Sequence, residues 1–149
     1  MLEKTARSAL LAQDQAPLVI RRIDAIPVAL PLKTPMKMSA ETITAAQNLL
    51  VRIEAVDGTV GWGEAASAPT MTGDTLEGLL AAVRDHLGPA LIGQDVRQRG
   101  ALSRRLKAVL YGNPGAHSAV EVALLDLAGK ASGQPLVELV TEVVRTLRR

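Results

Sequence analysis

Few residues of this chain have the type and spacing that catalysis requires. His86 and His117 have no cysteine or second histidine at ligand spacing, so each is expected at the surface or at a helix end. Ser67 and Ser118 are not in the strand-to-helix turn that exposes a nucleophilic serine. No two carboxylates have the spacing of a metal site. The residues alone therefore predict no catalytic side chain and no metal ligand.

The stretch GWGEAASAPTMTGDT, residues 61–75, is the part of the chain where binding is easiest to place. It joins an expected strand to an expected helix, and loops of this kind often carry specificity. Gly61 and Gly63 lack the spacing of a phosphate-binding loop. We expect Glu64 to bond loop amides or an arginine and so to shape the turn, and Trp62 to pack against the sheet.

The composition limits the classes of protein to which the chain can belong. The 149 residues are 48% hydrophobic and 21% charged, which suffices for one core, and without phenylalanine that core must consist of Leu, Val, Ile and Ala. The net charge of +2, with basic pairs not interleaved with aromatics, predicts no nucleic-acid partner. No cysteine is present. No apolar run reaches the roughly 20 residues of a membrane span, and no signal peptide is evident, so we expect a cytoplasmic protein without a membrane partner.

Alternating hydrophobic residues predict a sheet in the first half of the chain. Residues 18–30 partly alternate and contain Pro27, which is typical of an edge strand. Leu49, Val51, Ile53 and Ala55 alternate with residues of the opposite face, and Asp57-Gly58 supplies a hairpin turn to the next strand. We therefore expect three antiparallel strands. The segment 31–45, with two prolines and no clear period, is expected to be a loop.

Helical spacing begins after the stretch 61–75. For the first helix we expect Asp74 at the N-cap, with Glu77 in capping-box spacing, and an end at Gly88-Pro89. Three more helices are predicted over about 95–110, 117–133 and 135–147. The helix 117–133 is apolar nearly all round and should be buried on most sides. Its Asp126 and Lys130 are four residues apart and are expected to form a structural pair.

A sheet followed by helices is an α+β arrangement, and the order of motifs resembles one family. The phrases are ALPLKTPM, LLVRIEAVDGTVGWGEA, MTGDT, LGPALIGQD and AHSAVEVALLDLAGKASGQPLVEL. Together they resemble the N-terminal capping domain of the enolase superfamily, in its mandelate racemase and muconate lactonizing enzyme branch. The resemblance implies a three-stranded antiparallel sheet followed by a helical bundle. We divide the chain into an appendage (1–17), the capping domain (18–134) and a terminal amphipathic helix (135–149).

The resemblance also implies a function. In this family a modified (β/α)8 barrel follows the capping domain and supplies lysine or histidine bases and acidic ligands for Mg²⁺, which stabilises an enediolate. The implied activity is racemisation, epimerisation or cycloisomerisation of a carboxylate substrate. After GQPLVEL this chain reads VTEVVRTLRR, without the family's K-x-K pair. We therefore expect a truncated protein with no catalytic centre and no cofactor of its own.

Two loops of the family's capping domain close over the substrate, and by resemblance they are residues 32–43 and 67–75. The candidate substrate-loop residues are Lys33, Met36, Lys37, Met38, Thr70, Met71 and Thr72. The lysines could meet an anionic group and the methionines could line an apolar pocket, although ordinary loop surface is the favoured interpretation.

Two alternatives remain: a stand-alone module that oligomerises or binds a protein, and a small-ligand binder without chemistry. Expected partners are a second copy of the chain, through exposed apolar surfaces, or a separate barrel.

Overall fold

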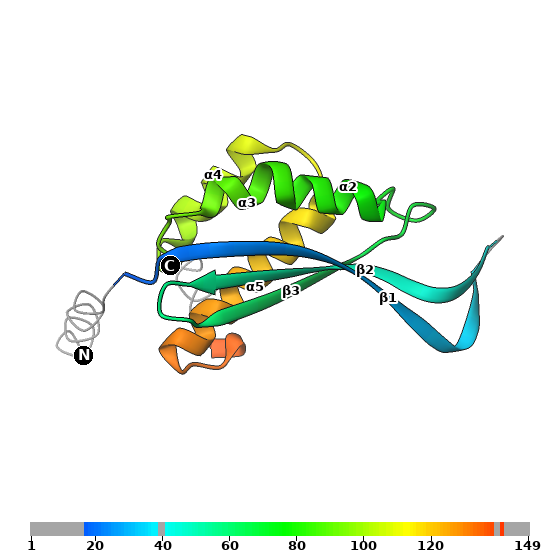
Figure 1. Cartoon of the computed structure of the whole chain (residues 1–149), viewed down its shortest axis with the longest axis horizontal. Helices are drawn as coiled ribbons and strands as arrows, with labels where there is room; N and C mark the ends of the chain where they lie inside the picture. The colour runs from blue at the N-terminus through cyan, green and yellow to red at the C-terminus, as the bar shows by residue number, and fades with distance from the viewer. Residues whose placement is uncertain (1–16, 39–40, 139–140, 142–149) are drawn as a thin grey trace.

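The computed structural model describes residues 17–38, 41–138 and 141, and within them a three-stranded antiparallel sheet precedes the helices (Figure 1). The elements are β1 (Ile20–Met38), β2 (Glu41–Ala55), β3 (Val60–Ala66), α2 (Leu76–Ala81), the π-helical segment η1 (Ala82–Leu87), α3 (Gly88–Leu91), α4 (Arg99–Val109) and α5 (Pro114–Ser132). The strand order is β1-β2-β3, so β1 is an edge strand as predicted. The α+β class is confirmed.

The hairpin between β2 and β3 forms as the sequence predicts. Gly58 has a φ of 86°, in the left-handed region that favours glycine, and its N–H donates to the carbonyl of Ala55. The Asp57 carboxylate accepts from the N–H of Thr59 at 2.9 Å, which closes the turn. The turn thereby fixes the register in which Val51 faces Gly63.

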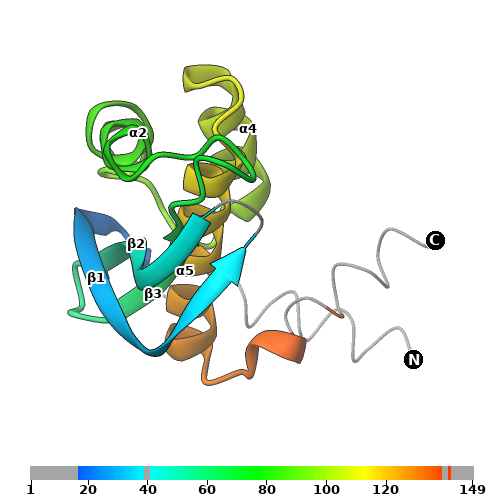
Figure 2. The ribbon, with the colours of Figure 1, turned by 90° about the vertical axis from the view of Figure 1, so that its right-hand side faces the viewer.

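The core lies between one face of the sheet and α5, which crosses β3 and β2 (Figures 1 and 2). Every buried hydrophobic side chain of the described residues is Leu, Ile, Val or Ala, as the composition predicts. Gly61 and Gly63 allow close packing here, because a Cβ at Gly63 would stand 1.9 Å from the carbonyl oxygen of Ala119. These glycines therefore let the backbone of α5 lie directly on β3.

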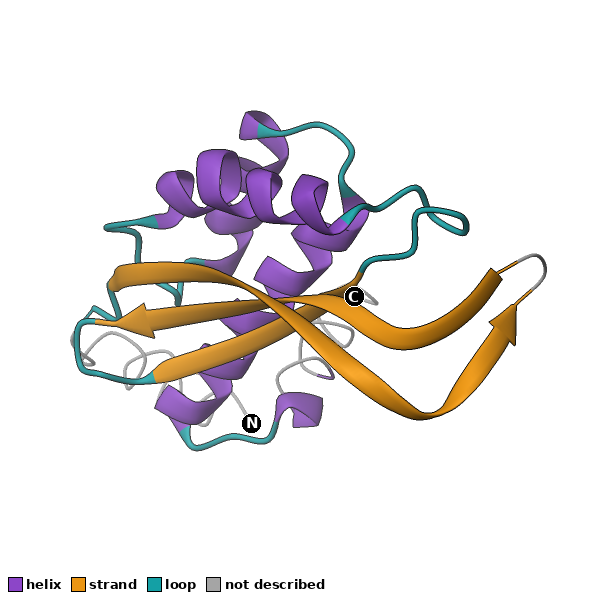
Figure 3. Cartoon of the chain, turned by 45° about the vertical axis from the view of Figure 1, so that its right-hand side comes forward, coloured by secondary structure: helices purple, strands orange, loops and turns teal. Residues whose placement is uncertain are grey.

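The prediction of a loop over residues 31–45 is wrong. β1 continues to Met38 and β2 begins at Glu41, so the two strands remain paired as a long arm (Figure 3). Proline is tolerated because β1 is an edge strand, where a missing N–H need not interrupt a second ladder. The lack of hydrophobic period reflects exposure on both faces of the arm rather than the absence of a strand.

The boundaries of the first helix differ from the prediction at both ends. Its N-cap is Thr75 rather than Asp74, and the Thr75 hydroxyl accepts from the N–H of Gly78 at 3.1 Å. Gly88-Pro89 does not end the helix, which continues through η1 and α3 to Leu91. In the π-helical turn the N–H of Gly88 bonds the carbonyl of Val83, five residues back, and this wider turn accommodates the proline ring.

The next two helices also begin at other residues than predicted. α4 starts at Arg99, because residues 95–98 form a turn in which the Asp95 carboxylate accepts from the N–H of Arg97. α5 starts at Pro114, a residue well suited to the first turn, after Asn113 with a φ of 51°. Most of the apolar side chains of α5 are buried, as predicted, and Val122 is an exception at 41% exposed.

The opposite face of the sheet carries a chain of ion pairs. Glu54 is buried and bonds both Arg21 and Arg52, and Arg52 also reaches Asp24. The hydrogen bond from Arg21, together with that from Arg52, lowers the pKa of the Glu54 carboxyl below its usual value. This network holds β1 and β2 together on the side away from the helices.

The structure describes only part of the two chain ends for which the sequence makes predictions. The proposed appendage 1–17 lies outside the described residues except for Pro17. Residues 136–138 and 141 are helical, which agrees with a helix after Pro135, and the rest of 135–149 lies outside the described residues. Within the described part of the chain, no helix is both long and apolar enough to cross a bilayer.

Candidate functional site

The arm formed by β1 and β2 extends beyond the end of β3 (Figure 3). Near its tip Met36 pairs with Ile43, Lys37 with Thr42 and Met38 with Glu41. Between the pairs Pro31–Ala45 and Met36–Ile43, residues 32–35 of β1 face Thr44 alone, which makes a large bulge. Bulges of this kind bend a strand pair, and the arm curves accordingly.

The loop 67–75 is closed by its own hydrogen bonds. The N–H of Ser67 donates to the carbonyl of Gln47 at 2.8 Å, which ties the loop to β2. The carbonyl of Ala68 accepts from the N–H groups of Met71 and Thr72, at 3.0 and 2.9 Å. The loop is therefore a compact unit that holds residues 69–71 out towards the arm.

Arm and loop meet through one side-chain hydrogen bond. The Thr70 hydroxyl donates to Oε2 of Glu41 at 3.3 Å. A hollow of about 450 Å³ lies between the two segments and the start of α2. It is lined by Glu41, Thr42, Ile43, Thr44, Ala45, Gln47, Ser67, Ala68, Pro69, Thr70, Met71, Thr75, Leu76 and Glu77.

The hollow is suited to binding a polar group. Its two charged lining residues are the carboxylates of Glu41 and Glu77, and the remaining polar groups are hydroxyls and the amide of Gln47. These groups can accept hydrogen bonds from a cation or an amide. Among the described residues no set of three His, Cys, Asp or Glu side chains could hold a metal ion.

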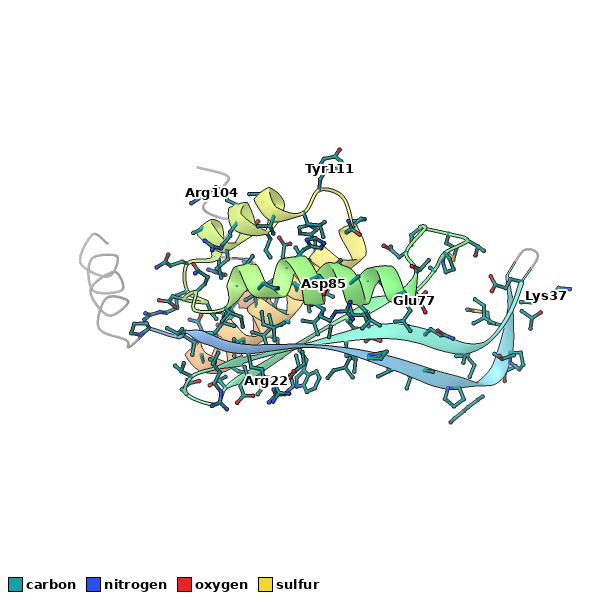
Figure 4. The ribbon with its side chains drawn as sticks, turned by 45° about the horizontal axis from the view of Figure 1, so that its top comes forward. Arg22, Lys37, Glu77, Asp85, Arg104 and Tyr111 are labelled. Atoms are coloured by element: carbon teal, nitrogen blue, oxygen red, sulfur yellow. The ribbon has the colours of Figure 1, made fainter. Side chains whose placement is uncertain are left out.

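The structure brings some of the predicted substrate-loop residues to the hollow and leaves others outside it. Thr70 and Met71 line it, and Met71 is 66% exposed. The Thr72 hydroxyl is bonded within the loop, to Oδ2 of Asp74 at 2.8 Å. Lys37 lies at the far end of the arm, outside the lining (Figure 4).

The other predicted residues lie along β1. Lys33 is in the bulge and Met36 pairs with Ile43, and neither lines the hollow. Met38 pairs with Glu41 through the backbone, and its side chain lies outside what the structure describes. Neither lysine therefore lines the hollow, although Lys37 pairs with Thr42, which does.

Two charged residues of the hollow were not singled out from the sequence. Glu41 was inside the segment 32–43, but its position opposite Met38 follows only from the pairing of the arm. Glu77 was assigned to helix capping, whereas Thr75 caps α2 and leaves the Glu77 side chain exposed beside the loop (Figure 4). No local pattern of the sequence marks either carboxylate, because the strand pairing and the cap at Thr75 place them.

The predicted roles of two other acidic residues can be compared with the structure. Glu64 accepts from the side-chain amide of Asn48 on β2, so the expected bond to loop amides or an arginine is wrong. The pair of Asp126 and Lys130 is confirmed, with Nζ and Oδ2 at 2.6 Å. Oδ2 of Asp126 also accepts from the backbone N–H of Trp62 at 2.8 Å, which joins α5 to β3.

The histidine and tryptophan side chains add no chemistry to this site. Nε2 of His117 lies 3.0 Å from the carbonyl oxygen of Leu110, at the start of α5 as expected for a residue near a helix end. Trp62 lies on the sheet face opposite α5, across from Arg52, and is 42% exposed.

Residues 20–141 match the family described as "Mandelate racemase / muconate lactonizing enzyme, N-terminal domain". The chain belongs to this family. It is similar to the L-Ala-D/L-Glu epimerase of Bacillus subtilis, with 36% identity over 80% of this chain and 33% of the relative. It is also similar to the L-Lys-D/L-Arg epimerase of Methylococcus capsulatus, with 39% identity over 73% of this chain and 31% of the relative.

A solved structure of the family shows the same fold. The dipeptide epimerase of Cytophaga hutchinsonii, crystallised with Mg and the dipeptide D-Ala-L-Val, has a TM-score of 0.78 at 30% identity. The match covers 83% of this chain and 33% of that one. The chain thus spans about a third of the length of these relatives.

Proposed function

We propose that this chain is the substrate-capping domain of a magnesium-dependent racemase, epimerase or cycloisomerase that acts on a carboxylate substrate. The observation that carries the proposal is the hollow between the arm and the loop 67–75, joined by the bond from Thr70 to Glu41. These are the two segments that the family resemblance assigns to covering a substrate. Their hydrogen-bonding groups would hold the part of the substrate remote from the reacting carbon and exclude water from it.

The proton transfer and the metal belong to another part of the enzyme in this proposal. The described residues do not fit a magnesium site, because no three ligating side chains come together among them. The proposal places the Mg²⁺ ligands and the bases in the barrel that the resemblance implies. This chain would contribute binding and orientation, which act on specificity as well as on rate.

The charge of the hollow favours a substrate whose distal group is cationic. Glu41 and Glu77 line the hollow without a lysine or arginine among the lining residues. A lysine or arginine side chain of a dipeptide would meet these carboxylates as a charge-assisted hydrogen-bond donor. The similarity to a relative named L-Lys-D/L-Arg epimerase supports this choice of substrate class.

The proposal can be tested by a domain graft. Residues 20–141 would replace the matching segment of the B. subtilis epimerase, with the unmodified epimerase as the control. Loss of the α-proton of the second residue of L-Ala-L-Lys and L-Ala-L-Glu would be followed by NMR in D₂O with Mg²⁺. We expect exchange by the graft and none by the isolated chain. A folded graft that exchanges neither dipeptide would overturn the capping function, and exchange by the isolated chain would overturn the assignment of the chemistry to the barrel.

A second role as a self-associating module is favoured by one observation. Leu136 and Val137, which follow α5, are 42% and 69% exposed. Exposed apolar residues of this kind often pack against a second copy. Light scattering should then give a defined oligomer that Val137→Asp dissociates, and a monomer at high concentration would exclude this role.

A further inference from the structure

β3 is the second edge strand of the sheet, and side chains of α5 bond to its outer edge. The strand order β1-β2-β3 places β3 opposite β1 among the described residues. The backbone N–H of Trp62 donates to Oδ2 of Asp126 at 2.8 Å, and Nζ of Lys130 donates to the carbonyl oxygen of Val60 at 3.0 Å. Two side chains of one helix therefore occupy the positions at which a neighbouring strand would bond to β3.

The close contact between α5 and β3 brings these side chains within reach of the edge. Gly61 lies between the two bonded residues of β3, and a Cβ there would stand 2.1 Å from the carbonyl oxygen of Ala123. The helix is thus near enough for the short side chain of Asp126 to reach the strand. Nζ of Lys130 lies 2.6 Å from Oδ2 of Asp126, so the pair presents one donor and one acceptor, as the N–H and C=O of a strand do.

The other edge of the sheet is blocked by different means. On β1 the N–H of Ile20 donates to the carbonyl of Gln94, and its carbonyl accepts from the N–H of Gly93, both at 2.9 Å. Further along the strand, Pro27 and Pro31 have no N–H to offer to an incoming strand. Natural proteins commonly protect edge strands with covering segments, prolines and charged side chains. At β3 the protection comes from the charged pair on α5.

Without this pair, β3 would present a short and partly apolar strand edge. In an antiparallel ladder the backbone groups of every second residue point to the same side, so those of Val60, Trp62 and Glu64 share the outer edge. A two-fold pairing centred on Trp62 would place Val60 of one copy opposite Glu64 of the other. It would also bring two tryptophans together, and aromatic pairs of this kind stabilise sheets. Self-pairing of β3 is therefore the association that an unprotected edge favours.

We propose that Asp126 and Lys130 block the edge of β3 and prevent a second copy of the chain from adding a strand there. An incoming strand must take the N–H of Trp62 from Asp126 and the carbonyl of Val60 from Lys130. It would also cover the two charged side chains, which are 32% and 48% exposed, and removing charges from water opposes the pairing. This role is separate from the hollow between the arm and the loop, and from the exposed apolar residues that follow α5.

Sedimentation velocity of the 149-residue chain and of the double variant Asp126→Ala/Lys130→Ala tests the block, over micromolar to millimolar concentrations. The weight-average mass of the double variant should rise to at least about twice that of the unmodified chain, because the simplest product is a two-fold dimer. Adding Glu64→Pro should return the mass to that of the unmodified chain, since proline removes an N–H from the outer edge and leaves the ladder with β2 intact.

Arg84→Ala/Asp85→Ala is the matched control, because it removes an exposed ion pair with a distance of 2.7 Å that lies on η1 and not on the sheet. It should leave the mass unchanged, and circular dichroism should show that all variants fold. Hydrogen exchange distinguishes the block from a purely structural bond. In the double variant the amide of Glu64 should become protected as the concentration rises, whereas loss of a structural bond would only speed exchange at Trp62 at every concentration.

The proposal is overturned if the double variant keeps the mass of the unmodified chain at every concentration, or if the control associates as strongly. It is equally overturned if Glu64→Pro does not reverse the association, or if the amide of Glu64 gains no protection. Should the double variant fail to fold, Lys130→Met retains the bond from Trp62 to Asp126 and gives the same test. A mass equal to that of the unmodified chain would then overturn the proposal.

Discussion

Replacing Gly63 by alanine should destabilise the fold strongly, although the substitution adds only one methyl group. The new Cβ would stand 1.9 Å from the carbonyl oxygen of Ala119 and 2.9 Å from the backbone nitrogen of Ala123. Both obstacles are backbone atoms of α5, so no side-chain rotation can relieve the contact. Because the φ of Gly63 is not in the left-handed region, the effect reports the steric contact rather than backbone strain.

The magnitude follows from the displacement of α5. An ordinary contact needs more than 3.0 Å, so the helix or β3 must move by more than an ångström. Overpacking of this kind typically lowers the free energy of unfolding by about 1–3 kcal/mol and occasionally more. Replacing glycine by alanine also reduces the conformational entropy of the unfolded chain, which raises the free energy of unfolding by roughly 0.4–1 kcal/mol. Because backbone meets backbone, the upper end of the cost applies, and we expect a net loss of about 2 kcal/mol, which corresponds to a fall in Tm of roughly 4–8 °C for a domain of this size.

Urea unfolding followed by circular dichroism, with Gly100→Ala as the control, measures this loss. A Cβ at Gly100 would meet only the end of the Arg104 side chain, at 3.6 Å, so in the first turn of α4 the control should be neutral or stabilising by up to about 1 kcal/mol. If Gly63→Ala unfolds at the same urea concentration as the unmodified chain, the close contact between β3 and α5 is not present in solution.

Two further predictions concern the ion pairs and the helix cap. Because its bonds to Arg21 and Arg52 lower the folded-state pKa of Glu54, its stabilisation is present above the unfolded pKa and is lost as the pH falls through the folded pKa. Glu54→Gln should therefore flatten the dependence of Tm on pH below about 5, and an unchanged acid limb would contradict the role of the pair. Thr75→Ala should cost about 0.5–2 kcal/mol in urea unfolding while Thr75→Ser retains the cap, and equal losses in both variants would refute the capping bond.

The hairpin and the core could be predicted from the sequence because local rules determine them. The alternation over Leu49–Ala55 requires one buried face, and Asp57-Gly58 provides the turn that joins β2 to β3. The packing role of Gly61 and Gly63 depends on which helix covers β3. That choice rests on contacts between residues about 60 positions apart, which no local pattern encodes.

The arm and the candidate site were harder to predict for the same reason. The arm is exposed on both faces, so its strands have no hydrophobic period, and prolines suggest a loop where an edge strand tolerates them. The two segments that the resemblance assigns to the substrate both line the hollow, yet its charge comes from Glu41 and Glu77, which lie 36 positions apart. Only the folded arm and the start of α2 bring these carboxylates to one hollow.

If the arm and the loop select the distal group of the substrate, a charge reversal at Glu41 in the grafted enzyme should change which dipeptide the enzyme prefers. We would measure the ratio of kcat/KM for L-Ala-L-Lys to that for L-Ala-L-Glu, with Glu138→Arg, an exposed position outside the hollow, as the control. Glu41→Arg should lower this ratio at least tenfold, equivalent to about 1.4 kcal/mol, while Glu138→Arg should leave it unchanged. A ratio that is the same in the grafted enzyme and both variants would show that the arm does not select the distal group.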